Sequence, residues 1–139
     1  FRQFLNKSPN HPGGLLGMLK ANLMQGKYSE VKKIIDEFPP SPEYACMEVI
    51  RPLYDAMVRV ISEQATTDDP LEAEYDNALH LTMRGNLPAA MDGMIDILRQ
   101  DKHYHNEEVR KVLLGLFEVL GTNNPLTQQY RQELALVLF

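Results

Sequence analysis

Apolar residues recur along this chain at the three- and four-residue spacing of an α-helix, and no segment alternates as a β-strand does. The clearest stripe comprises Val109, Val112, Leu113, Leu116, Phe117 and Leu120. A second long stripe lies within a helix expected from about Pro42 to Gln64, and shorter stripes begin at Val31 and Leu87. Each stripe places apolar side chains on one helix face. The pattern therefore predicts an all-α fold of about seven helices.

Prolines and glycines lie where these helices should begin and end. Three predicted starts carry a capping residue directly before a proline, whose missing N–H is not needed at the first helical position. These starts are Ser41-Pro42, Asp69-Pro70 and Asn124-Pro125. A glycine suited to a left-handed C-cap follows three apolar-periodic segments, at Gly26, Gly85 and Gly121. Pro52 falls inside the long helix, so we expect a kink or a break there.

Two of these glycines mark an internal repeat. When Gly26 is aligned with Gly85, 59 residues later, apolar positions of the following helices coincide. The coinciding pairs include Tyr28 with Leu87, Val31 with Ala90 and Ile35 with Met94. Gly121 follows Gly85 by 36 residues, which resembles the roughly 34-residue period of tetratricopeptide repeats. Because a single helical hairpin cannot bury its apolar face, we predict one domain of stacked, tetratricopeptide-like hairpins over residues 1–139.

Charge, apolar runs and cysteine usage narrow the class of partner and the compartment. The net charge is −5 with both signs interspersed, so no basic stripe predicts a nucleic-acid partner. No apolar run approaches the roughly 18 residues that would span a membrane. The single cysteine, Cys46, excludes an intrachain disulfide and suits a reducing, cytoplasmic location. Because the chain begins at Phe1 without a signal-like segment, we expect it to be the C-terminal part of a longer protein.

No residue pattern indicates an enzyme, a cofactor or a metal site. One cluster has the composition of a ligand set, namely His103, His105, Glu107 and Glu108. Two histidines at positions i and i+2 point apart on a helix, so we interpret the segment as a solvated turn that leads to an N-cap at Asn106. Serine, aspartate and histidine residues occur without a nucleophile elbow around them. Cys46 has acidic neighbours, and we predict a buried, unreactive thiol.

The last third of the chain carries a more specific resemblance. Between Asn106 and Phe139 the motifs Leu120-Gly121, Pro125-Leu126, Tyr130-Arg131, Leu134-Ala135 and Leu138-Phe139 follow one another. This order resembles the C-terminus of the bacterial thioredoxin-like chaperones with a tetratricopeptide tail, also called chaperedoxins. The resemblance implies a holdase that protects unfolded clients and passes them to the chaperonin. Because this chain has no CxxC pair and no βαβ pattern, only the contacts of the tail with clients and chaperonin are implied for it.

A first candidate surface follows from the repeat, since the first helix of each pair lines a concave face. The positions that fall on this face are Leu16, Lys20, Leu23, Met24, Tyr75, Leu79 and Met83. Flexible methionines let one surface repack against many partners, so this set is a candidate client groove. The alternative is that these residues are core, covered by the long helix around Pro52. A clamp for an acidic peptide terminus is not expected, because Lys20 is the one cation among them.

A second candidate surface lies on the last helix. Its apolar stripe, predicted to pack on the preceding helix, comprises Tyr130, Leu134, Val137 and Leu138. Leu136 and Phe139 fall off this stripe, and with Arg131 they form a candidate docking site for a partner, which the resemblance implies is the chaperonin. The alternative is a terminus tucked onto its own domain. We therefore predict a protein-binding module of a thioredoxin-type chaperone, the alternative being a structural adaptor or dimerisation module that positions an attached domain.

Overall fold

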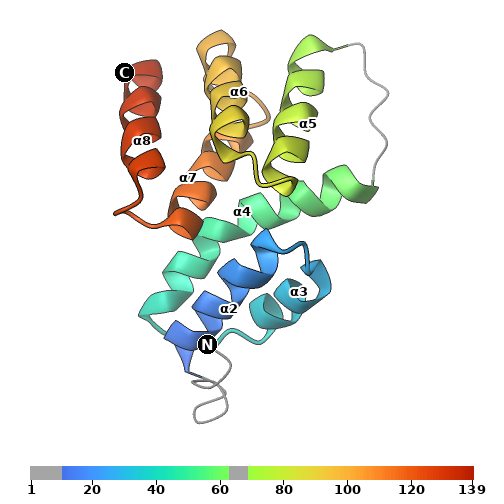
Figure 1. Cartoon of the computed structure of the whole chain (residues 1–139), viewed down its shortest axis with the longest axis vertical. Coiled ribbons are helices and arrows are strands. Elements are labelled where there is room, and N and C mark those ends of the chain that lie inside the picture. The colour runs from blue at the N-terminus through green and yellow to red at the C-terminus, as the bar shows by residue number, and fades with distance from the viewer. Residues whose placement is uncertain (1–10, 63–68) are drawn as a thin grey trace.

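The structure is a computed structural model that describes residues 11–62 and 69–139. Within these ranges the chain forms seven α-helices and no strand (Figure 1). They are α2 (Pro12–Met24), α3 (Tyr28–Asp36), α4 (Pro42–Ser62), α5 (Pro70–Met83), α6 (Leu87–Gln100), α7 (Glu108–Leu120) and α8 (Pro125–Leu138). The all-α prediction is confirmed. The predicted end of the long helix at Gln64 lies outside the described residues.

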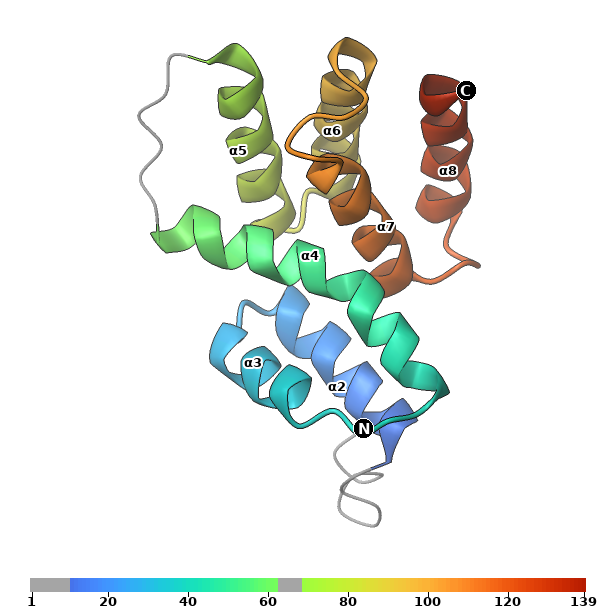
Figure 2. The same ribbon diagram turned by 180° about the vertical axis from the view of Figure 1, so that it is seen from behind.

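The long helix α4 divides the molecule into two sides. The α2–α3 hairpin lies on one side of α4, and α5 to α8 lie on the other (Figures 1 and 2). α4 packs against α2 and α5 and most extensively against α7, whereas α5 pairs with α6. α8 lies against α6 and α7. Because it contacts both sides, α4 joins the two groups of helices into one core.

All three helices begin at the predicted proline, and the predicted side-chain cap forms at two of these starts. The side chain of Asp69 accepts a hydrogen bond from the backbone N–H of Leu71 at 3.0 Å. Asn124 accepts in the same way from the N–H of Leu126 at 2.9 Å. Ser41 differs, because its hydroxyl turns back and donates to the carbonyl of Pro39 at 3.1 Å. Its oxygen is therefore directed to the preceding loop and not to the first turn of α4.

Gly26 and Gly85 end α2 and α5 with the same turn, as the repeat predicts. Their φ angles are +78° and +83°, which a residue with a Cβ rarely adopts. In both turns the backbone N–H of the residue after the glycine donates to a carbonyl at 2.9 Å. Lys27 donates to Asn22, and Asn86 donates to Leu81. Gly121 differs from the prediction, because its φ of 89° is combined with a ψ of 156°, outside the left-handed helical region. The third glycine therefore ends its helix by a different geometry.

Pro52 bends α4 without breaking it. The helix is continuous from Pro42 to Ser62 and contains Pro52 in its interior. The ribbon changes direction midway along its length (Figures 1 and 2). A proline inside a helix removes one backbone hydrogen bond and its ring displaces the preceding turn, which accounts for the bend. Of the two predicted outcomes, the kink is confirmed.

The contact between α4 and α7 forms the centre of the core. Five residues of the α7 stripe are buried, namely Val109, Val112, Leu113, Leu116 and Phe117, while Leu120 is half-buried. Gly115 lies at the closest approach, where an added Cβ would be 3.1 Å from the Val49 carbonyl oxygen and 3.1 Å from the Cβ of Leu53. The absence of a side chain at Gly115 therefore lets the two helix backbones come together.

Candidate functional site

Part of the predicted client groove is core. Three of its residues, Leu23, Tyr75 and Leu79, are 0% exposed. The guanidinium of Arg59 on α4 lies 5.6 Å from the centre of the Tyr75 ring. These three side chains belong to the hydrophobic core, as the alternative prediction for this set has it, which corrects their assignment to an open groove.

The other four groove residues remain partly accessible. Leu16, Lys20, Met24 and Met83 are half-buried. The ammonium of Lys20 lies 3.8 Å from a carboxylate oxygen of Glu118 on α7, so this cation already has an intramolecular partner. Leu16, Met24 and Met83 pack against the edge of the core. Binding of a client at this edge stays a prediction.

An ion pair links α4 to α7, and an aromatic ring from α5 packs against it. One guanidinium nitrogen of Arg59 donates to both carboxylate oxygens of Glu108 on α7, at 2.9 and 3.1 Å. The Tyr75 ring from α5 lies under the same guanidinium. Burial, and then the Glu108 carboxylate, raise the pKa of Tyr75, and its hydroxyl has no hydrogen-bond partner among the described residues. No sequence signal marks this cluster, because its members are far apart in the chain and follow no local pattern.

The histidine-rich segment before α7 is a turn, as predicted, but its backbone is unusual. His105, Asn106 and Glu107 have φ angles of 53°, 54° and 70°, which are rare for residues with a side chain. The N-cap of α7 is Glu107 and not the predicted Asn106, because the left-handed stretch runs through Glu107 and the helix begins at Glu108. The Glu107 carboxylate accepts from Arg110 at 2.6 Å and lies 3.2 Å from Nδ1 of His103. These contacts, led by Arg110, lower the pKa of Glu107.

Neither this turn nor Cys46 has the geometry of a reactive centre. Among the described residues, no three His, Cys, Asp or Glu side chains lie close enough to hold a metal ion. Cys46 is half-buried, which differs from the buried thiol predicted for it. Its thiol sits near Glu118, and burial, followed by this carboxylate, raises its pKa. A raised pKa leaves less of the nucleophilic thiolate at neutral pH.

The last helix presents one packed face and one open face. Tyr130 and Leu134 are buried, and the Tyr130 hydroxyl donates to a carboxylate oxygen of Asp92 on α6 at 2.7 Å. In contrast, Leu136 is 82% exposed and Phe139 is 101% exposed. Val137 and Leu138, the rest of the predicted stripe, are half-buried. The stripe packs more on α6 than on the preceding helix α7, which corrects its predicted partner, and Leu136 and Phe139 are not tucked onto the domain.

Arg131 lies between the open face of α8 and the core. Arg131 is exposed, and its guanidinium is 5.8 Å from the centre of the Phe117 ring on α7. At this distance a cation is attracted to the face of an aromatic ring. Arg131 therefore helps to hold α8 on α7, in addition to its predicted place in the docking site.

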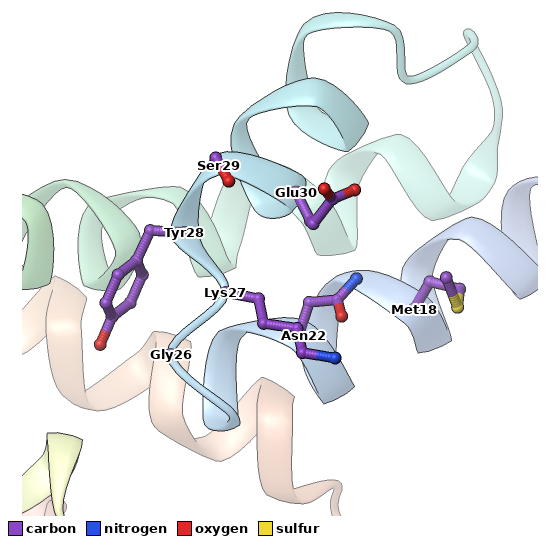
Figure 3. A pocket seen from close by; sticks show the side chains of 7 residues that line it. All are labelled: Met18, Asn22, Gly26, Lys27, Tyr28, Ser29 and Glu30. Atoms are coloured by element: carbon purple, nitrogen blue, oxygen red, sulfur yellow. The ribbon is translucent and has the colours of Figure 1, made fainter.

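A cavity that no sequence pattern indicates lies between α2 and the start of α3 (Figure 3). Its volume is about 690 Å³, and its lining residues are Met18, Asn22, Gly26, Lys27, Tyr28, Ser29 and Glu30. The N-cap residue of α3, Lys27, makes no side-chain hydrogen bond to the helix start. The cavity combines an ammonium, an amide, a carboxylate and a thioether, and so has no single chemical character.

Comparison with known proteins identifies the type of repeat. A family model described as tetratricopeptide repeat matches residues 55–139, from the second half of α4 through α8. No curated protein and no solved structure matches the chain. Within residues 11–62 and 69–139, none of the helices combines the length and apolarity needed to cross a bilayer.

Proposed function

Since this chain belongs to the tetratricopeptide repeat family, we propose that it is the protein-binding tail of a thioredoxin-type chaperone. The family implies a protein–protein interaction module, because its stacked hairpins present extended surfaces to partners. The finer assignment rests on the resemblance of residues 106–139 to the chaperedoxin tail, which lies inside the matched region. On this proposal the chain works in the cytoplasm and contacts unfolded clients and the chaperonin.

The observation that carries the proposal is the open face of α8. Leu136 and Phe139 expose almost all of their apolar surface, although the other large apolar residues of α8 are buried or half-buried, namely Leu126, Tyr130, Leu134, Val137 and Leu138. A helix that lays a few apolar anchors into a groove gains most of its binding energy from those anchors. We therefore assign chaperonin docking to Leu136 and Phe139. Arg131 helps to hold α8 in place through its contact with the Phe117 ring on α7.

Clients are assigned to the accessible edge beside α4. Met24 and Met83 are half-buried, and their flexible thioethers can adapt to unrelated apolar segments. Leu16 and the stem of Lys20 extend the same kind of surface along α2. Because Leu23, Tyr75 and Leu79 are buried in the core, a client would meet the edge of the original groove and not its floor.

The test of docking is co-elution of the chain with the chaperonin. The double variant Leu136→Ser with Phe139→Ser should lose co-elution while helical content and Tm stay nearly unchanged, since both side chains are exposed. Ile61→Ser is a matched control, because Ile61 is an exposed apolar residue on α4, 53% exposed, and its change should leave co-elution intact. Unchanged co-elution of the double variant would refute the docking role, and a large fall in Tm would place these side chains in the core.

The same open face also suits the second candidate function, a dimerisation module that positions an attached domain. Two copies could pair through Leu136 and Phe139, since a closed dimer joins the same patch on both subunits. Sedimentation equilibrium and suppression of aggregation of a denatured test protein distinguish the two functions. A monomer that suppresses aggregation supports the chaperone tail. A tight dimer that is inactive in that assay, and that the double variant dissociates, supports the dimerisation module.

A further inference from the structure

We draw no further inference here: the strongest candidate, the cavity between α2 and the first turn of α3, rests on the N-terminus of α3 and on surface side chains, and nothing in it points to a particular ligand.

Discussion

α7 and α8 are consecutive helices of 13 and 14 residues, yet they pack in different ways. The residues that α7 buries are Val109, Val112, Leu113, Gly115, Leu116 and Phe117. Those that α8 buries are Thr127, Tyr130 and Leu134, and the Tyr130 hydroxyl lies within hydrogen-bond distance of two acceptors on α6. The difference arises because α7 is covered by α4, whereas the outer face of α8 has no covering helix among the described residues. α7 therefore holds the fold together, and α8 is the helix with surface left for a partner.

The largest expected effect is at the centre of α7. Phe117→Ala should lower the free energy of unfolding by about 3–5 kcal/mol, because it opens a cavity in a region with little room to relax. Urea denaturation followed by circular dichroism measures this loss. The matched change on α8 is Leu136→Ala, which should stay within about 0.5 kcal/mol of the parent because the side chain is exposed. Similar losses for the two variants would contradict the contrast between the helices.

A pair of glycine substitutions sharpens the account of how α7 meets α4. Gly115→Ala should destabilise the protein by about 1–3 kcal/mol, since the added Cβ would press on the α4 backbone. Gly93→Ala on α6 is the control, because its Cβ would lie 3.5 Å from the Cβ of Ala78, an ordinary contact. That variant should gain about 0.5–1 kcal/mol from the better helix propensity of alanine. If the two substitutions change the stability by the same amount, α4 and α7 approach each other less closely at Gly115 than described.

Removal of the Tyr130 hydroxyl should weaken the attachment of α8 to α6. Tyr130→Phe deletes the hydroxyl that donates to Asp92, and it should cost about 1–2 kcal/mol because the acceptor is a carboxylate. The ring remains in place, so helical content should be unchanged. Amide hydrogen exchange should become faster in α8 than in the parent protein while α7 stays protected. Equal acceleration in both helices would show that α8 does not open separately.

The smallest effect concerns the start of α7. Arg110 and His103 lower the pKa of Glu107, so its ionised form is favoured in the folded protein. This contribution is present above the ordinary carboxylate pKa and is lost as the pH falls through the lowered value. Glu107→Gln should therefore flatten the decline in Tm between neutral pH and about pH 3. An unchanged pH profile would mean that the carboxylate does not support this turn.

Features set by neighbouring residues were predictable, and features set by distant ones were not. The turns at Gly26 and Gly85 followed from local signals, since helix ends depend on a few adjacent residues. The sequence could not decide whether Tyr75 lines a groove or the core, because the same helix face serves either role and the outcome depends on where α4 lies. The shift of the N-cap to Glu107 was missed because a left-handed stretch without glycine gives no sequence signal.

The position of α4 also has a consequence for how the chain folds. The α2–α3 and α5–α6 hairpins join residues that are close in sequence, so they can form early and at little cost in loop closure. α7 can bury its stripe only after it meets α4, and the pair Arg59 and Glu108 is separated by 49 positions. Contacts of such long range slow folding. We therefore expect the hairpins to form first and the docking of α7 on α4 to limit the rate, so that nascent chains expose the α7 stripe until the two helices meet.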